Sequence, residues 1–161
     1  MPELKRLVAE LGLGEVVGFS DPVAAEHIVD FVERADIGII PYRVDGFAEL
    51  VLPTKAYELA WMRIPIIAAE TAGIRSMFRP ESITLCAPGD PESFAEAFIA
   101  LARDPERRAS LVASAAEDYV PYEWEGMSAR YRELLDTLSR GSRSPSVGTH
   151  TEARAVGAAV E

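Results

Sequence analysis

The chain has 161 residues, of which 48% are hydrophobic, 26% charged and 8% aromatic. This composition is typical of a folded globular domain with a real core, and it excludes a disordered or fibrous chain. The formal net charge of −10 makes nucleic acid and anionic membrane surfaces poor partners, because an acidic surface repels phosphate groups. A nucleotide ligand is still compatible with this charge, since helix N-termini bind phosphate with few basic side chains.

Hydrophobic periodicity predicts helices and strands that alternate along the chain. The expected helices, in chain order, span residues 3–13, 24–34, 53–62, 73–78, 90–102, 104–119 and 123–140. The expected strands are the apolar runs 16–19, 36–42, 65–69 and 83–87, of which the second should be covered on both faces. Seven apolar helix residues are expected in the core: Ile28, Phe31, Val32, Trp61, Phe94, Phe98 and Trp124.

This alternation predicts an α/β fold with a Rossmann-like parallel sheet and helices on both faces. Residues 1–140 are expected to form one domain. Residues 141–161 are small and polar without periodicity, so we expect a disordered tail. The chain begins on a helix, whereas a nucleotide-binding α/β domain begins with a strand and a glycine-rich turn, which suggests either a small four-stranded unit or a missing first strand.

Cysteine and histidine usage argues against disulfides and metal sites. Cys86 is the single cysteine and lies in an apolar run, so we expect a buried thiol. His27 and His150 are far apart and have no acidic or cysteine partners at ligand spacing, so no metal site is predicted. No uncharged apolar stretch approaches about 18 residues and the N-terminus is charged. We therefore expect a cytoplasmic protein, and nothing indicates membrane contact.

The helix that follows the strand 36–42 begins where ligands bind in open parallel sheets, at the carboxyl ends of the strands. A phosphate there would meet the backbone N–H groups of Thr54 and Lys55 and the positive end of the helix dipole. Glu58, one turn further on, could accept two hydrogen bonds from a ribose diol. A plainer interpretation is an exposed Lys55–Glu58 ion pair of a few tenths of a kcal/mol. The residues alone leave both interpretations open.

Residues 51–59 read VLPTKAYEL and are followed by IPIIA at 64–68. The segments ADIGIIPY (35–42), PGDP (88–91), LARDPERR (101–108) and YEWE (122–125) accompany them. In order and spacing, these segments resemble the retaining glycosyltransferases of the GT-B fold, family 4, in the sub-group with an "LP-x-K-x-x-E" block. The resemblance covers roughly residues 3–138. That family usually has glycine where this chain has Arg63, and an arginine there costs about 1 kcal/mol if its φ is positive.

The resemblance implies the C-terminal half of a GT-B fold, which binds a nucleoside-diphosphate sugar and helps to transfer the sugar to an unknown acceptor. No cofactor and no metal is implied. The residues implied in donor binding are Leu52, Pro53, Thr54, Lys55, Glu58 and Gly73. A catalytic acid near the donor sugar would lie eight positions before Glu58, where this chain has Leu50. The adjacent Glu49 is the candidate for that role.

The family's catalytic unit also has an N-terminal acceptor-binding domain, which this chain lacks, so alone it is expected to be incomplete and inactive. Two alternatives remain open. One is a non-catalytic nucleotide- or sugar-binding module, or a subunit of a split transferase. The other is an unrelated doubly wound protein, such as a sugar-nucleotide epimerase or a receiver-like domain. A receiver needs a phospho-acceptor aspartate after a strand, whereas Asp36 precedes its strand.

Overall fold

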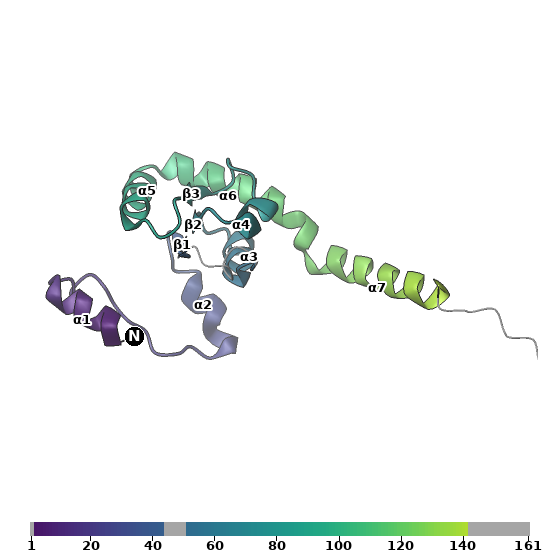
Figure 1. Cartoon of the computed structure of the whole chain (residues 1–161), viewed down its shortest axis with the longest axis horizontal. Coiled ribbons are helices and arrows are strands. Elements are labelled where there is room, and N and C mark those ends of the chain that lie inside the picture. The colour runs from purple at the N-terminus through teal and green to yellow at the C-terminus, as the bar shows by residue number, and fades with distance from the viewer. Residues whose placement is uncertain (1, 44–50, 142–161) are drawn as a thin grey trace, which may run out of the picture. The chain divides into compact units, whose positions relative to one another are not determined.

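The computed structural model describes residues 2–43 and 51–141. The chain forms two compact units, Met1–Val120 and Pro121–Glu161. The first contains a three-stranded sheet with helices around it (Figure 1). Its elements are α1 (Pro2–Glu10), η1 (Ala25–His27), α2 (Ile28–Val32), β1 (Gly38–Ile40), α3 (Thr54–Trp61), β2 (Ile66–Ala69), α4 (Ala72–Met77), β3 (Thr84–Cys86), α5 (Pro91–Arg103) and α6 (Pro105–Tyr119). The short helix η2 (Val120–Tyr122) spans the end of the first unit and the start of the second.

The sheet is parallel, with the strands in the order β1–β2–β3. Gly38 pairs with Ile66, and Ala69 pairs with Cys86. All four residues of β2 are buried, as expected of a middle strand covered on both faces. In β1 the side chain of Ile39 is 42% exposed, so the expectation that this strand is fully covered is wrong for Ile39.

Helices cover both faces of the sheet, as predicted. Because side chains alternate along a strand, Gly38 and Ile67 face opposite sides. A β-carbon at Gly38 would stand 2.4 Å from Cδ1 of Leu59, so α3 lies directly against that face. On the other face, Ile67 packs in a buried cluster with Cys86, Leu101 and Leu111. Figure 1 accordingly shows α3 and α5 on opposite sides of the strands.

The helices after the sheet begin where their start signals place them. Asp90 accepts hydrogen bonds from the backbone N–H groups of Glu92 and Ser93, at 3.0 and 3.4 Å, and so caps α5. Asp104 is both the C-cap of α5 and the N-cap of α6, where it accepts from the N–H of Arg107 at 2.8 Å. Each aspartate satisfies donors that a helix start leaves free, and each is followed by a proline that suits the first turn.

Arg63 ends α3 in a left-handed conformation, with φ of 61°. Its N–H donates to the Ala60 carbonyl at 3.2 Å, and the N–H of Ile64 donates to the Leu59 carbonyl at 3.0 Å. This is the Schellman arrangement, in which glycine is the usual residue at the position that Arg63 occupies. The φ of Arg63 is therefore positive, the case for which the sequence predicts a cost of about 1 kcal/mol relative to glycine.

The N-terminal segment departs from the prediction. α1 and the left-handed Gly12 that follows it agree with the expected helix, but residues 16–19 form no strand. The N–H groups of Val16 and Val17 donate locally, to the Leu13 carbonyl, and Val16 is 77% exposed. An apolar run becomes a strand only beside another strand, and the described residues offer none here.

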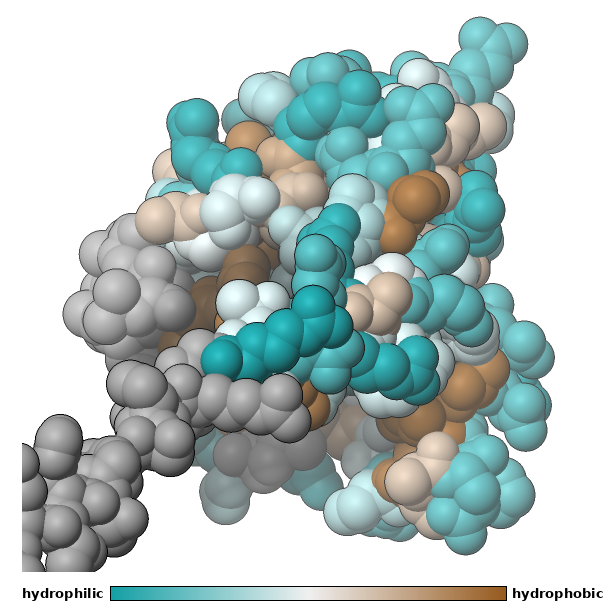
Figure 2. Space-filling view, turned by 90° about the vertical axis from the view of Figure 1, so that its right-hand side faces the viewer, coloured by the Kyte–Doolittle hydropathy of each residue, from teal (hydrophilic) through white to brown (hydrophobic). Residues whose placement is uncertain are grey.

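Several apolar side chains expected in the core are exposed instead. Trp61 and Trp124 are 58% and 76% exposed, and three others are also exposed: Ile28, Phe31 and Phe98. Only Phe94 and Val32 are half-buried. A helical stripe shows which residues share a face, but burial also requires a surface that covers that face. Figure 2 shows one face of the molecule, where hydrophobic areas interrupt a mainly hydrophilic surface.

The second unit contains α7 (Trp124–Gly141), which agrees with the predicted last helix. Its apolar side chains repeat at alternating intervals of three and four residues: Trp124, Met127, Tyr131, Leu134 and Leu138. All five are exposed. The predicted disordered tail, which begins at residue 141, falls almost entirely on residues 142–161, outside the described residues.

Candidate functional site

The start of α3 lies beyond the carboxyl end of β1. Pro53 is the N-cap, with φ of −69° and ψ of 116°, and its carbonyl accepts from the N–H of Ala56 at 2.9 Å. The sequence predicts Pro53 as the first residue of the helix, whereas in the structure the helix begins one residue later, at Thr54. The next two N–H groups, of Thr54 and Lys55, belong to the first turn, which has no intrahelical acceptor for them. Both residues are exposed, so a ligand has access to this helix start.

Lys55 and Glu58 lie on the solvent face of α3, because the buried residues of that helix are Ala56, Leu59 and Ala60. The Lys55–Glu58 ion pair of the plainer interpretation does not form. Within the described part of the chain, neither Lys55 nor Glu58 has an ion-pair partner. Both charges are therefore available to a ligand.

Gly73 comes close to the segment that leads into α3. A β-carbon at Gly73 would stand 2.6 Å from the carbonyl oxygen of Val51 and 3.6 Å from Cδ2 of Leu52. The cap of α4 is Thr71, which is buried and accepts from the N–H of Ile74 at 3.3 Å. The structure thus brings Gly73 and Leu52 together, although they are 21 positions apart in the sequence.

The candidate catalytic acid is not located by the structure. Glu49 lies outside the described residues, as do the neighbouring Leu50 and Asp45. Its prediction as a sugar-side acid therefore stays a prediction.

An ion pair at the carboxyl end of the middle strand was not anticipated from the sequence. Glu70 directly follows β2, and its N–H donates to the Cys86 carbonyl at 2.9 Å. Its carboxylate pairs with Arg75 of α4. The sequence contained a signal for this ion pair. Glu70 comes directly after a buried strand, and the oppositely charged Arg75 follows five residues later, across the start of a short helix.

A cavity of about 380 Å³ opens beside β1. It is lined by Ile39, Pro41, Arg43, Gly89, Asp90, Pro91 and Phe94. Gly89 has a φ of 74° and donates its N–H to the Tyr42 carbonyl at 3.2 Å. This contact joins the turn after β3 to the chain leaving β1, so the carboxyl ends of the outer strands are tied together.

Burial raises the pKa of the Cys86 thiol, although a hydrogen bond with the Ser93 side chain acts in the opposite direction. The thiol is 3% exposed and packs in the core, as the sequence predicts. In residues 2–43 and 51–141 no group of three or more potential metal ligands occurs. None of the helices described is both long and apolar enough to cross a membrane.

Comparison with known families decides between the open interpretations of the fold. The family described as Glycosyl transferases group 1 matches residues 1–104. The chain belongs to this glycosyltransferase family. An unrelated epimerase or receiver is thereby excluded.

Curated relatives of this group 1 glycosyltransferase chain are longer than it is. A D-inositol 3-phosphate glycosyltransferase of Thermobispora bispora is 29% identical over 150 residues, which are 92% of this chain and 34% of the relative. The enzyme of the same name from Acidothermus cellulolyticus is 30% identical over 137 residues, or 82% of this chain and 29% of the relative. The chain thus spans about a third of the length of the curated relatives it matches.

Solved structures of similar fold include a domain of the same family. Sucrose-phosphate synthase from Thermosynechococcus elongatus superposes with a TM-score of 0.73 at 23% identity, over 88% of this chain and 35% of that one. HepE of Anabaena, in complex with UDP and glucose, superposes with a TM-score of 0.70 at 18% identity, over 86% of this chain and 36% of that one. The C-terminal domain of a group 1 glycosyltransferase, LpcC of Francisella tularensis, superposes with a TM-score of 0.61 at 20% identity, over 76% of this chain and 62% of that one. The fold of this group 1 chain is therefore a Rossmann-like, GT-B-type domain.

Proposed function

We propose that this chain is the donor-binding portion of a retaining glycosyltransferase that uses a nucleoside-diphosphate sugar. One observation carries the proposal. The start of α3, with Lys55 and Glu58 exposed and without ion-pair partners among the described residues, lies beside Gly73 and the start of α4. Both helix starts follow strands of a parallel sheet, which is where such sheets bind ligands.

Each residue has a distinct role in this proposal. The N–H groups of Thr54 and Lys55 and the Lys55 ammonium bind the diphosphate, because a helix start and a cation both favour negative charge. The Glu58 carboxylate accepts the two ribose hydroxyls. Leu52 and Pro53 shape the segment that leads into the helix, and the missing side chain of Gly73 leaves room for the donor sugar.

Two finer assignments follow the sequence motif. We assign the chain to family 4 and to its "LP-x-K-x-x-E" sub-group, on the residues from Leu52 to Glu58. The UDP and UDP-glucose complexes of HepE support a nucleotide sugar as the ligand class. We place the protein in the cytoplasm, where the reduced Cys86 thiol is stable.

The rest of the activity belongs to the part of the relatives that this chain does not match. We propose that acceptor binding lies there, and that residues 1–161 without it bind the donor but do not transfer the sugar. A non-catalytic binding module, or a subunit that pairs with a separate acceptor domain, would bind nucleotide in the same way. Transfer assays with and without a polypeptide that corresponds to the unmatched part separate the binding module from the other two cases, because only a binding module stays inactive in both.

Nucleotide titration tests the donor site directly. UDP, GDP and their glucose derivatives are titrated into the protein by calorimetry, and the Glu58→Ala and Lys55→Ala variants are compared with it. Each change is expected to weaken binding by about 1–3 kcal/mol, the range for hydrogen bonds to charged groups. Both side chains are exposed, so the fold should persist.

Matched controls come from the same chain. Lys5 is the other lysine and lies over the Phe19 ring in the N-terminal segment, and Glu96 is an exposed carboxylate on α5. Lys5→Ala and Glu96→Ala are expected to leave the affinity unchanged. If Glu58→Ala and Lys55→Ala bind nucleotide as tightly as these controls, the proposed donor site is wrong.

A further inference from the structure

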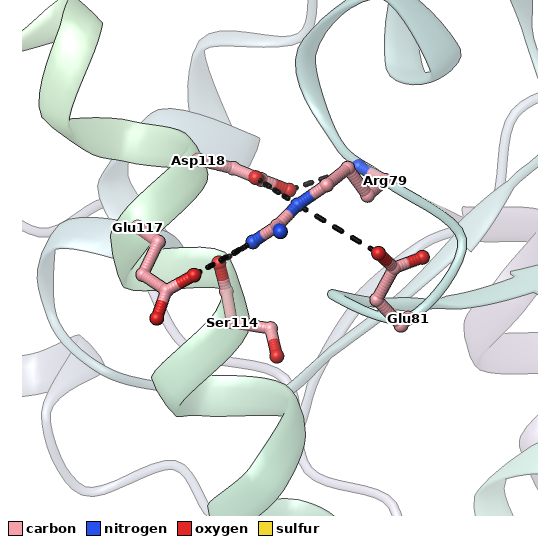
Figure 3. Close-up of polar contacts among 5 residues, drawn as sticks. All are labelled: Arg79, Glu81, Ser114, Glu117 and Asp118. Carbon is pink, nitrogen blue, oxygen red and sulfur yellow. Dashed lines mark hydrogen bonds and ion pairs between the residues drawn. The ribbon is translucent and has the colours of Figure 1, made fainter.

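Arg79, in the loop after α4, makes the densest set of polar contacts among the described residues (Figure 3). Its backbone N–H and its Nε donate to the two carboxylate oxygens of Asp118, at 2.9 and 2.6 Å. Its Nη2 donates to Oε2 of Glu117 at 3.0 Å and to the Ser114 carbonyl at 3.4 Å. All these acceptors lie in the last two turns of α6.

Asp118 holds both the backbone and the side chain of Arg79. Its carboxylate is only 10% exposed, so it is shielded from the solvent that weakens surface ion pairs. The hydrogen bonds that Arg79 donates to Glu117 and Asp118 raise the pKa of its guanidinium. The contact is directional.

The same end of α6 also contacts α3. The ring of Tyr119, next to Asp118, meets the ring of Tyr57 edge to face, with centroids 6.4 Å apart and planes at 65°. Tyr57 lies between Lys55 and Glu58 in the sequence. Residues 114–119 of α6 thus hold α4 through Arg79 and α3 through Tyr57.

α4 is short enough to transmit a shift along its length. It has six residues, Ala72–Met77, and Gly73 at its start and Arg79 beyond its end are separated by about one and a half turns. Ile74, Met77 and Phe78 are buried, but apolar contacts are non-directional and permit small rotations and translations. The fork of Arg79 removes that freedom, because guanidinium hydrogen bonds have a fixed geometry.

We propose that Arg79 is a positioning residue for the donor site: through Asp118 and Glu117 it fixes the start of α4 relative to the start of α3. This inference rests on the proposed function, since the two helix starts are the two sides of the proposed donor site. Arg79 itself lies at the opposite end of α4 from Gly73 and does not touch the ligand.

The test compares Arg79 with Arg108, an arginine that also makes several hydrogen bonds to protein acceptors. Arg108, on the first turn of α6, donates to the carbonyls of Leu101 and Ala102 at 2.7 and 2.8 Å and contacts neither α3 nor α4 through a hydrogen bond. Arg79→Met and Arg108→Met therefore remove arginine contacts at opposite ends of α6. Both variants are expected to lower the melting temperature, so stability alone does not separate them.

Two measurements do separate them. Hydrogen exchange at the amides of Ile74 and Phe78 reports the opening of α4, and calorimetry with UDP and GDP reports donor affinity. In Arg79→Met we expect exchange at these amides and the dissociation constant both to rise about 3- to 10-fold, the range for residues that act through others. In Arg108→Met both should stay within about twofold of the parent protein.

Two further variants keep the inference testable if Arg79→Met does not fold. Asp118→Asn keeps the shape of the side chain but offers one acceptor oxygen instead of two, so it should reproduce the Arg79→Met effect at reduced size. Arg79→Lys keeps the charge but not the fork, and should bind nucleotide as weakly as Arg79→Met. Full recovery of affinity in Arg79→Lys would overturn the role of the fork.

Failure of the inference and failure of the proposed function give different results. If Glu58→Ala weakens nucleotide binding while Arg79→Met leaves both exchange and affinity unchanged, the donor site stands and the positioning role is wrong. If the protein binds no nucleotide, the proposed function is wrong and the donor-site role of Arg79 fails with it. Exchange at Ile74 and Phe78 then still decides whether Arg79 holds α4 in place.

Discussion

Gly73 and Val51 approach so closely that a β-carbon at position 73 would stand 2.6 Å from the Val51 carbonyl oxygen. The obstructing atom belongs to the backbone, so no side-chain rotation relieves the clash. Glycine is required here for the close approach of two chain segments. Gly73 is thus required for packing, in addition to its predicted role at the donor sugar.

Gly73→Ala is expected to push the start of α4 away from the segment that leads into α3. The cost should be about 1–3 kcal/mol of unfolding free energy, as for other overpacked sites, and nucleotide affinity should fall as well. Urea unfolding and UDP titration measure the two effects. Gly126→Ala in α7 is the control: its β-carbon meets nothing within 4 Å, and it should stabilise the helix by about 0.5–1 kcal/mol. A Gly73→Ala protein that unfolds and binds like the parent would contradict this account.

Gly38 and Leu59 form a coupled pair between β1 and α3. A β-carbon at Gly38 would stand 2.4 Å from Cδ1 of Leu59, so Gly38→Ala should destabilise the protein by about 1–3 kcal/mol. Leu59→Ala alone should cost about 2–5 kcal/mol. In the double variant the new methyl group enters the space that Leu59 leaves, so the combined loss should be smaller than the sum. Additive losses in urea unfolding would show that the two residues do not share this space.

Arg63 is a position where substitution should stabilise the protein. Its φ of 61° disfavours any residue with a β-carbon, whereas glycine adopts this conformation without strain. Arg63→Gly is expected to raise the unfolding free energy by about 0.5–1 kcal/mol. Arg63→Ala is the matched control, because it removes the charge and keeps the strain, so it should bring no such gain. Equal stabilisation by both variants would point to the charge instead.

The stability that Cys86 contributes should depend on pH. Burial raises the pKa of its thiol in the folded protein, so the folded state holds the proton more tightly than the unfolded state. The contribution is fully present below the thiol pKa of the unfolded chain, about 8.5, and is lost as the pH rises through the higher pKa of the folded state. The difference in unfolding free energy between the parent and Cys86→Ala should therefore shrink from pH 7 to pH 10. A constant difference would contradict a buried, protonated thiol.

The parts of the fold that local sequence determines were predicted well. Asp90 and Asp104 mark their helix starts because a carboxylate in that position satisfies free N–H groups regardless of the rest of the protein. The short apolar run at residues 65–69 was also predicted as a strand, and it forms β2.

The wrong predictions concern features that depend on distant partners. The run at residues 16–19 has the composition of a strand, but pairing needs a neighbour that sequence periodicity does not specify. Trp61 and Phe98 lie on apolar helical faces and are exposed for the same reason. In the site, the contact of Gly73 with Val51 and the contacts of Arg79 with α6 join segments far apart in the chain, so no local pattern announces them.

Asp104 leaves no spare residue at the corner between α5 and α6, because it closes one helix and starts the next. A single inserted residue would move its carboxylate away from the N–H of Arg107 or carry Arg108 away from the carbonyls of Leu101 and Ala102. This corner should tolerate substitutions better than changes of length. Because the hydrogen bonds of this corner span at most seven positions, the corner has a low contact order and is expected to form before the parallel strands, which join distant parts of the chain.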